Sequence, residues 1–233
     1  LAGIAFGEAV RLAREEVWSR CPDVNTWGAY QCYGDPAFRL YRDGSTVAAQ
    51  WPDFGTPHEL VTDLNNLIAG LRAGAAAEHG GEKIARRLAR IPKAQSENWQ
   101  RRADVCAALG QAWGELGQWE QAVDWLVKAL NSERGDCPMR AIEQLANFRV
   151  RLAAERWQKA RRLPNSKREI VRQSELTQVE SAILDLDTLC SRAPTVERLN
   201  LLGSAYKRLA LIESDRGRRL DALTNMAHHY QLS

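Results

Sequence analysis

The chain has 233 residues, of which 45% are hydrophobic and 26% charged, and its formal net charge at pH 7 is +3. This length can bury a sizeable core, and the composition is that of an ordinary soluble globular protein. A net charge this small implies no general attraction to nucleic acid or membrane, and no apolar run approaches the roughly 18 residues that span a bilayer. The five cysteines are scattered without a Cys-x-x-Cys pair, which argues for a reducing compartment. We therefore expect a cytoplasmic protein, and a chain that starts at Leu1 without a signal peptide is expected to be part of a longer one.

The first predicted element is an amphipathic helix over Ile4–Arg20, where apolar residues recur at helical spacing. An aromatic-rich segment, Asn25–Tyr33, follows between turn residues and predicts a strand, and Phe38–Tyr41 predicts a second short strand. A strand without neighbours leaves its backbone groups unpaired. We therefore expect Thr26–Tyr33 to pair with the segment that follows it or with the same strand of a second chain, which would give a homodimer.

This N-terminal segment resembles the last helix and last strand of a CHAT domain, a caspase-like fold found joined to tetratricopeptide repeats. The resemblance implies that residues 1–45 are the end of such a domain. It also implies that the catalytic Cys and His of the family would lie upstream of Leu1, so that this chain contains no catalytic residue. The residues that carry the resemblance are Phe6, Ala9, Ala13 and Arg14 in the helix, then Thr26, Trp27, Gly28, Ala29 and Tyr30, and finally Tyr33, Gly34, Asp35 and Pro36.

Residues 46–94 are expected to form a connector and linking helices. Trp51 and Phe54 lie in a segment rich in turn residues, and we expect them to hold the connector against a helix rather than to bind a ligand. The sequence Thr56-Pro57-His58-Glu59 predicts a helix start, because Thr is a good N-cap, Pro suits the first position and Glu completes a capping box. This helix should end near Gly74 or at Gly80-Gly81. Glu82–Arg90 predicts a second helix, and Ser96 is expected to cap the next one.

The segment Ala103–Leu130 predicts two short antiparallel helices separated by a turn at Gly117. A Gly next to a Leu, as at Leu109-Gly110, lets two helix backbones come close, while aromatic side chains fill the surrounding volume. The spacing Leu109-Gly110-x-x-Trp113, followed by Ala122-x-x-x-Leu126, resembles the tetratricopeptide repeat (TPR) pattern Trp-x-x-Leu-Gly-x-x-Tyr and then Ala-x-x-x-Phe. This resemblance implies a binding scaffold rather than a catalyst.

A second signature of the same kind is Leu199-x-x-Leu202-Gly203-x-x-Tyr206. The distance from Gly110 to Gly203 exceeds two repeats of about 34 residues and falls short of three. The middle, around Ala141–Cys190, should therefore hold an elongated or irregular helix pair, whose second helix is capped by Asn165 or Ser166. The predicted fold is mainly α: a TPR-like stack of antiparallel helix pairs, an α-solenoid, over residues 95–233, preceded by one helix and one or two strands.

In a TPR array the first helix of each pair lines a groove, so the resemblance implies a binding surface on those helices. The partner would be a protein or peptide, and the side chains opposite the packing positions are mixed in polarity. The candidate partner-binding residues are Asp104, Gln111, Glu115, Glu197, Asn200, Ser204, Lys207 and Arg208.

The sequence contains no motif for a catalytic centre, a metal or a cofactor. His79-Gly80-Gly81 follows Ala-rich helical sequence rather than a buried strand, and the adjacent His228 and His229 diverge by about 100° on a helix. The favoured function is a protein-interaction scaffold, and the resemblance implies that it would recognise a partner or regulate the upstream caspase-like domain. Two alternatives stay open: nucleic-acid binding through the basic stripe at residues 149–172, and a part in a cysteine peptidase whose catalytic Cys and His lie upstream.

Overall fold

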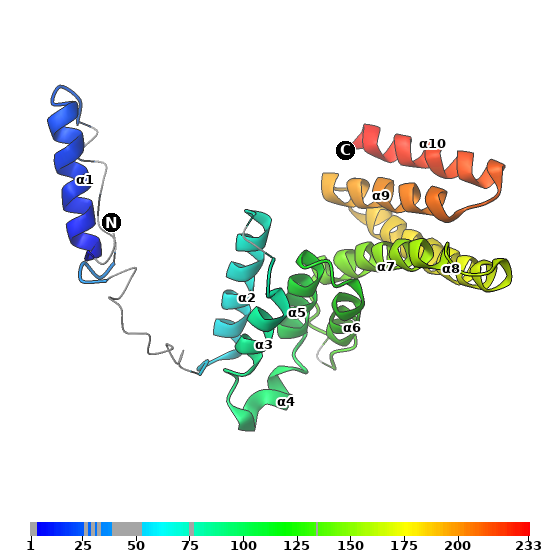
Figure 1. Ribbon diagram of the computed structural model, residues 1–233, viewed down its shortest axis with the longest axis horizontal. Coiled ribbons are helices and arrows are strands. Elements are labelled where there is room, and N and C mark those ends of the chain that lie inside the picture. The colour runs from blue at the N-terminus through cyan, green and yellow to red at the C-terminus, as the bar shows by residue number, and fades with distance from the viewer. Residues whose placement is uncertain are drawn as a thin grey trace. The chain divides into compact units, whose positions relative to one another are not determined.

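The structure is a computed structural model that describes residues 4–25, 28, 31, 34–38, 53–74, 77–133 and 135–233. The chain divides into two compact units, Leu1–Trp51 and Pro52–Ser233. The regular structure of the described residues is helical throughout, which confirms the mainly α prediction and agrees with a TPR-like α-solenoid. Figure 1 shows the order of the helices along the chain.

The first unit contains one long helix, α1 (Phe6–Arg20). Ala5 at its N-cap has no side-chain acceptor, so the carbonyl oxygens of Phe38 and Pro36 accept the N–H groups of Phe6 and Gly7 at 2.6 and 2.8 Å. The two carbonyl groups thus accept hydrogen bonds from two of the N–H groups that the first turn of a helix leaves without an intrahelical partner. The segment after the helix thus returns to cap α1.

The predicted N-terminal strand is not supported in the part of the segment that the structure describes. Asn25 and Gly28 lie in 3-10 turns and Gln31 is irregular, while Phe38 uses its carbonyl to cap α1 instead of pairing in a sheet. The remaining positions of Thr26–Tyr33 and the rest of the second predicted strand lie outside the described residues. The predicted pairing with a second chain also falls on these residues and stays a prediction.

The second unit begins with α2 (Pro57–Arg72), whose predicted start is confirmed. The Thr56 hydroxyl accepts the Glu59 N–H at 3.3 Å, and the Glu59 carboxylate reaches back to the N–H of Gly55 at 2.8 Å. Phe54 is buried against this helix, as predicted, with the Arg90 guanidinium 4.0 Å from its ring centroid. Trp51, its predicted companion, lies outside the described residues.

Two predicted helix starts differ in the structure. Helix α3 runs from Gly80 to Leu88, two residues earlier than expected, because His79 takes a left-handed conformation (φ 56°) and begins the helix directly after it. Ser96 starts only the single turn α4 (Ser96–Trp99), preceded by the 3-10 turn η2 (Lys93–Gln95). The chain turns there because Trp99 is inserted into the core, and the long helix starts afterwards, at Ala103.

The predicted helix pair of the first TPR signature is confirmed as α5 (Ala103–Glu115) and α6 (Trp119–Leu130). The turn between them needs a left-handed residue, which Gly117 supplies at φ 71°. A Cβ at Gly110 would lie 2.6 Å from Leu126 Cγ and 3.0 Å from the Ala122 carbonyl oxygen. Gly110 thus allows the close contact between the two helices that the sequence pattern predicts.

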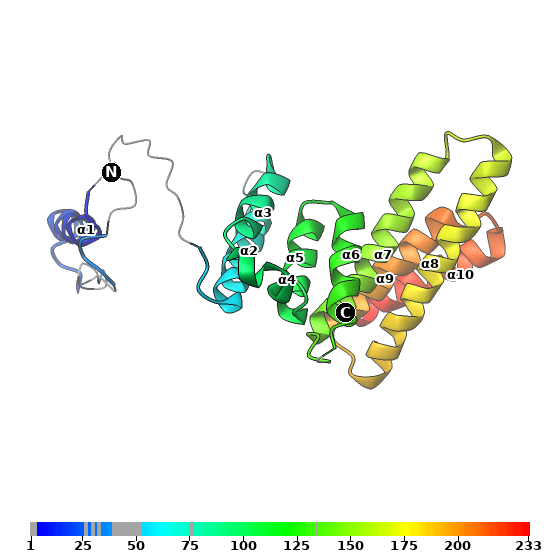
Figure 2. The same ribbon diagram turned by 90° about the horizontal axis from the view of Figure 1, so that it is seen from below.

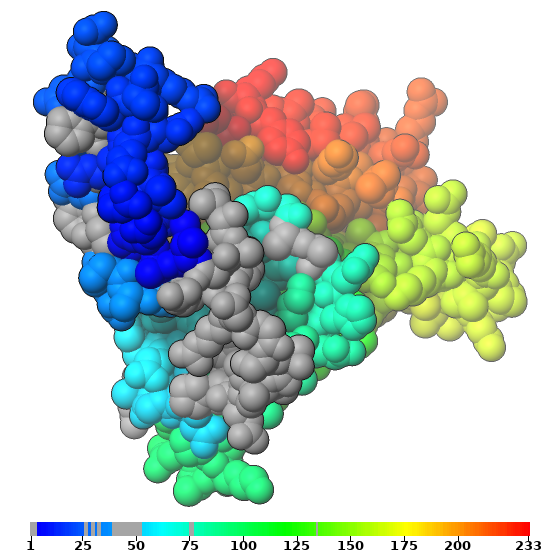
Figure 3. Space-filling model, turned by 60° about the vertical axis from the view of Figure 1, so that its left-hand side comes forward, coloured from blue at the N-terminus to red at the C-terminus, as the bar shows by residue number. Residues whose placement is uncertain are grey.

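The elongated middle pair is also confirmed, as α7 (Met139–Ala160) and α8 (Asn165–Arg192). The loop end of this pair, drawn in yellow, projects beyond the neighbouring helices α9 (Val196–Ile212) and α10 (Arg216–Leu232) in Figure 3. The predicted cap of α8 is wrong: Pro164 occupies the N-cap position, and Asn165 is already the first helical residue without a capping side-chain bond. Helix α9 has a side-chain cap, since the Thr195 hydroxyl accepts the Arg198 N–H at 3.2 Å.

The helices of the second unit stack pair after pair, as Figure 2 shows from α2 to α10. Each second helix packs on the first helix of the next pair, as α6 does on α7 and α8 on α9, and first helices also adjoin one another: α2 with α5, α5 with α7, and α7 with α9. Three clusters of buried apolar side chains lie between the pairs, so the core is continuous from α2 to α9. The first helices α5, α7 and α9 thus share one surface, which we call the inner face.

Candidate functional site

The inner face carries polar side chains from α5, α7 and α9, and at α5 these bind to α2. Glu115 of α5 accepts two hydrogen bonds from the Arg72 guanidinium, at 2.8 Å from Nε and 2.6 Å from Nη2. Gln111, one turn earlier, donates to the same carboxylate at 3.3 Å. The structure therefore brings the two predicted residues Gln111 and Glu115 together, and it adds Arg72 as their partner.

A second polar contact links α7 with α9. Gln144 Nε2 lies 3.4 Å from the carboxylate of the predicted residue Glu197, and the Arg140 guanidinium lies 4.0 Å from the same carboxylate. Gln144 is only 6% exposed. Beside it, Arg198 donates to Glu143 at 2.7 Å, and both side chains are 11% exposed. Neighbouring first helices are thus joined through polar groups as well as through the core.

The other predicted residues lie on α9 and at the start of α5. Arg208 Nη1 donates to the carbonyl and hydroxyl oxygens of Ser204, which places these two together on the inner face of α9. Asn200 and Lys207 are exposed on the same helix. Asp104 lies at the start of α5, where its carboxylate accepts two hydrogen bonds from Arg102, and this cation lowers the pKa of the Asp104 carboxyl.

Sequence reasoning missed the contribution of α7 to the inner face. Asn147 Nδ2 donates to Gln144 Oε1 at 3.1 Å, and Asn147 Oδ1 accepts from Arg151 Nε at 3.2 Å. The Arg151 guanidinium also lies over the ring of Trp119, 5.0 Å from its centroid. The signal was present, because polar residues at 140, 144, 147 and 151 recur at the spacing of one helix face.

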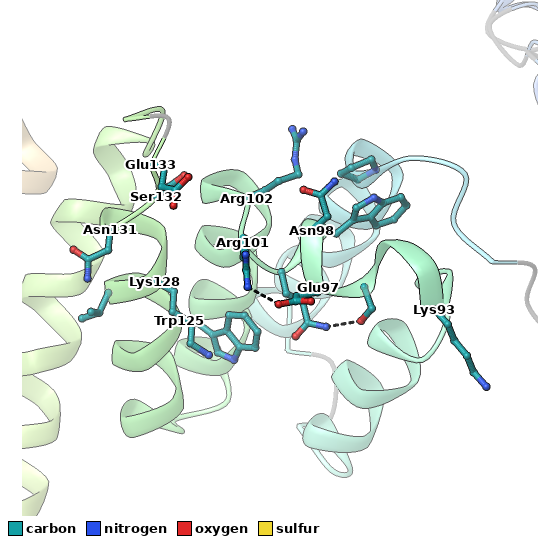
Figure 4. A pocket seen from close by; sticks show the side chains of 15 residues that line it. Lys93, Glu97, Asn98, Arg101, Arg102, Trp125, Lys128, Asn131, Ser132 and Glu133 are labelled. Atoms are coloured by element: carbon teal, nitrogen blue, oxygen red, sulfur yellow. Dashed lines mark hydrogen bonds and ion pairs between the residues drawn. The ribbon is translucent and has the colours of Figure 1, made fainter.

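A broad cavity of about 1010 Å³ lies on another side of the second unit, between the α4 region and α6. Figure 4 shows Trp125 and Lys128 of α6 facing Glu97 and Arg101 across it. Two of the charged groups that line it have partners within the chain: Glu97 pairs with Arg101, and the Lys128 ammonium lies 4.2 Å from the centroid of the Trp125 ring. These contacts do not indicate the chemistry of a ligand.

A smaller cavity of about 150 Å³ lies between α6, α7 and α8. Glu175 lines it and is 6% exposed, and burial raises the pKa of its carboxyl while the Arg156 cation acts in the opposite direction. Arg156 itself binds Glu120 at 2.7 Å. The cavity is too small for more than a few water molecules.

The cations of the basic stripe at residues 149–172 fall into two groups, those that form ion pairs and those that do not. Along the helices its cations other than Arg151 pair with acids, as Arg149 does with Asp185 at 3.5 Å and Arg156 with Glu120. Lys159 and Arg172 pair with Glu155 and Glu169 in the same way. The cations that have no ion pair among the described residues at the α7–α8 loop are Arg161, Arg162, Lys167 and Arg168.

The described residues contain no arrangement of His, Cys, Asp and Glu that could hold a metal ion. His79 begins α3, and His228 and His229 lie edge to face, 5.5 Å apart. Burial lowers the pKa of His229. None of the helices in the described part of the chain is long and apolar enough to cross a membrane.

Residues 118–233 match the protein family described as Tetratricopeptide Repeats-Sensor, TPR-S. The chain contains a TPR-S domain. This domain comprises helices α6 to α10, and its presence confirms the TPR part of the predicted resemblance. No curated protein and no solved structure matches the chain. The CHAT resemblance of residues 1–45 lies outside the TPR-S match and stays a prediction.

Proposed function

We propose that the protein is an interaction scaffold, and that a protein or peptide partner binds on the inner face of α5, α7 and α9. TPR-type domains generally mediate protein–protein interactions, and the TPR-S match places such a domain here. The observation that carries the proposal is that neighbouring first helices are joined by polar contacts on one surface, with Glu197 of α9 bound to Gln144 of α7. A binding surface held in this way is pre-organised, which lowers the entropy cost of association.

The inner face also offers polar side chains that the fold does not use. Asn200 and Lys207 are exposed on α9, and their side chains bind no other described residue of the chain, so a partner can bind them without breaking an internal bond. Removing either should leave the stability of the fold unchanged within about 0.5 kcal/mol, as is usual for surface positions. The proposal includes a non-catalytic role for this chain. It also includes a regulatory role towards an upstream caspase-like domain, and this regulatory role rests on the sequence resemblance alone.

Position-dependent photocrosslinking tests the proposal. A photoreactive amino acid at Asn200 samples the inner face, and the same amino acid at Leu184 of α8, where the side chain is 67% exposed, is the matched control. We expect a specific adduct from position 200 and none from position 184, and the partner identified by mass spectrometry should then bind the purified protein less tightly after Glu197→Lys. Adducts at position 184 alone would place the binding surface elsewhere.

Nucleic-acid binding stays an alternative function, and the ion pairs restrict it to the α7–α8 loop. The cations Arg161, Arg162, Lys167 and Arg168 would have to supply the phosphate contacts there, since those along the helices, apart from Arg151 on the inner face, pair with acids. Binding of a generic oligonucleotide that weakens steeply with salt, and that Arg162→Gln and Arg168→Gln abolish together, would favour this alternative.

A further inference from the structure

Two arginines on the inner face have no carboxylate partner among the described residues. Arg151 lies on α7 and Arg208 on α9, and both side chains are half-buried. The other arginines that link α7 with α8 and α9 have acidic partners, Arg149 with Asp185 and Arg198 with Glu143. A half-buried charge without a partner costs free energy, which makes these two exceptions informative.

Arg151 is held so that part of its guanidinium stays available. Its Nε donates to Asn147 Oδ1 at 3.2 Å, and the orientation of that amide is set because Asn147 Nδ2 donates to Gln144 Oε1. The ring of Trp119 supports the guanidinium from one side. Neither Nη group of Arg151 donates a hydrogen bond to a described residue. The N–H donors of these two groups, which form one edge of the planar guanidinium, are therefore free to bind a ligand.

Arg208 is fixed in a similar way on the neighbouring helix. Its Nη1 donates to the Ser204 carbonyl at 3.1 Å and to the Ser204 hydroxyl, while its Nε and Nη2 bind no described group. Burial and the positive charge of Arg151 lower the pKa of the Arg208 guanidinium, and the Tyr230 phenol acts in the opposite direction. The register of α7 and α9 places the two cations at the same part of this interface. Gln144 contacts Glu197, and the two helices run in the same direction (Figure 2), so Arg151 and Ser204, each seven residues further along, lie at the same level, where Ser204 binds the Arg208 guanidinium. No carboxylate among the described residues pairs with either guanidinium.

We propose that Arg151 and Arg208 form a binding site for a phosphoryl group on the inner face. Guanidinium groups recognise both phosphate and carboxylate through pairs of parallel hydrogen bonds. A carboxylate offers two oxygens and one negative charge, whereas a phosphoryl dianion offers three oxygens, so that two arginines can each bind it through a different pair of oxygens. Its charge of about −1.5 to −2 near pH 7 also balances two guanidinium cations.

This inference rests on the proposed use of the inner face, and it names the chemistry of the ligand that binds there. The phosphoryl group can belong to a small phosphate ester or to a phosphorylated side chain of the protein partner. Inorganic phosphate contains the shared chemistry and needs no partner, so it tests the site separately from the scaffold function. Failure with phosphate would leave the crosslinking test of the scaffold function untouched.

The experiment is calorimetric titration of the full chain with inorganic phosphate, with succinate as the carboxylate probe, at constant ionic strength. The variants are Arg151→Gln and Arg208→Gln, and Arg162→Gln at the exposed α7–α8 loop is the control that removes the same charge elsewhere. We expect each of the two inner-face variants to weaken phosphate binding by about tenfold or more, because a charge-assisted contact is lost. The control should bind as the parent protein does.

Folding of the variants is checked by their thermal midpoints without phosphate. We expect Arg151→Gln and Arg208→Gln to unfold at or above the temperature of the parent protein, because each removes the repulsion between the two cations. Phosphate should raise the midpoint of the parent and of Arg162→Gln only, as expected for a ligand that binds the folded state. Absence of phosphate binding, or equal binding by all variants, would overturn the site.

A final comparison identifies the carrier of the phosphoryl group. A pentapeptide with phosphoserine between alanines should bind more tightly than inorganic phosphate if the group belongs to a protein partner, because the peptide backbone adds contacts along the inner face. Equal affinities would indicate a small phosphate ester. Either result supports the site, whereas succinate binding as tightly as phosphate would overturn the phosphoryl assignment.

Discussion

The two Leu-Gly pairs occupy equivalent positions in the TPR pattern, and the structure predicts that alanine substitution has different effects at each. An alanine in a helix interior is favoured over glycine by about 1 kcal/mol. Against this gain stands the contact of the new Cβ. At Gly110 the Cβ would lie 2.6 Å from Leu126 Cγ and 3.0 Å from the Ala122 carbonyl oxygen, so the backbone of α6 would have to move. Overpacking of this kind costs about 1–3 kcal/mol.

At Gly203 the Cβ would lie 2.9 Å from Cδ1 and Cε1 of Tyr230. This ring belongs to the last turns of α10 and is 41% exposed, so it can move towards solvent. The contact is therefore relieved at little cost, and the preference of the helix for alanine remains. We expect Gly110→Ala to destabilise the protein by about 1–2 kcal/mol net, and Gly203→Ala to leave it unchanged or to stabilise it by about 0.5–1 kcal/mol.

Urea and thermal denaturation followed by circular dichroism would measure the difference. For a chain of this size, 1 kcal/mol corresponds to a change of about 2–4 °C in Tm. A Gly110→Ala protein as stable as the parent would refute the reasoning, because it would show that α6 moves away freely. A Gly203→Ala protein that is less stable than Gly110→Ala would refute it as well, since the ring of Tyr230 would then be as fixed as the backbone of α6.

Three further predictions concern the core and the helix ends. Arg198→Met should destabilise the protein by about 3–5 kcal/mol in chemical denaturation, because Glu143 is left charged and 11% exposed; a loss below 1 kcal/mol would mean that solvent reaches this carboxylate. Burial raises the pKa of the Cys106 thiol to about 11, so the unfolded state loses this proton first and stability should fall by on the order of 2 kcal/mol as pH rises from about 9 through 11. Cys106→Ala should remove that part of the pH dependence, and an unchanged profile would contradict the assignment. Thr56→Ala and Thr195→Ala should each cost about 1 kcal/mol, since each hydroxyl caps a helix; equal stability of parent and variants in urea would show that water replaces the cap.

The repeat fold could be predicted from the sequence where local signals and packing agree. The capping sequence at Thr56, the turn at Gly117 and the close approach at Gly110 all depend on neighbours within one helix pair. The predicted length of the middle pair followed from counting residues between Gly110 and Gly203. These features are local, so that a pattern of residue types is enough to specify them.

The errors occur where a distant part of the chain decides the local structure. Ser96 has the side chain of an N-cap, but burial of Trp99 in the core ends the helix after one turn. Asn165 is likewise a good capping residue, yet Pro164 takes the cap position before it. In the first unit, Phe38 and Pro36 cap α1 through their carbonyl groups, a role that their side chains do not reveal.

In the candidate site, too, local sequence predicts some features while others depend on distant parts of the chain. All eight predicted residues were assigned by counting helix faces, and the structure gives six of them hydrogen-bond partners: Asp104, Gln111, Glu115, Glu197, Ser204 and Arg208. Arg151 was missed because in sequence it belongs to a basic run, and only the fold separates it from Arg149 and Arg156. Which cations have acidic partners depends on contacts between helices, and these cannot be counted along one helix.

The interface between α7 and α9 differs at its two ends, and this difference bears on how a ligand would act. At one end the pairs Glu143–Arg198 and Gln144–Glu197 attract the helices to each other. Two to three turns further along, Arg151 and Arg208 have no acidic partner among the described residues, and their like charges repel each other. An anion between these two arginines turns the repulsion into attraction, so its binding energy acts directly on the packing of α7 against α9. A ligand shifts a conformational equilibrium only if it binds one of the two states more tightly. An anion binds more tightly when Arg151 and Arg208 are close together, so it would favour close packing at the interface that joins the last two helix pairs.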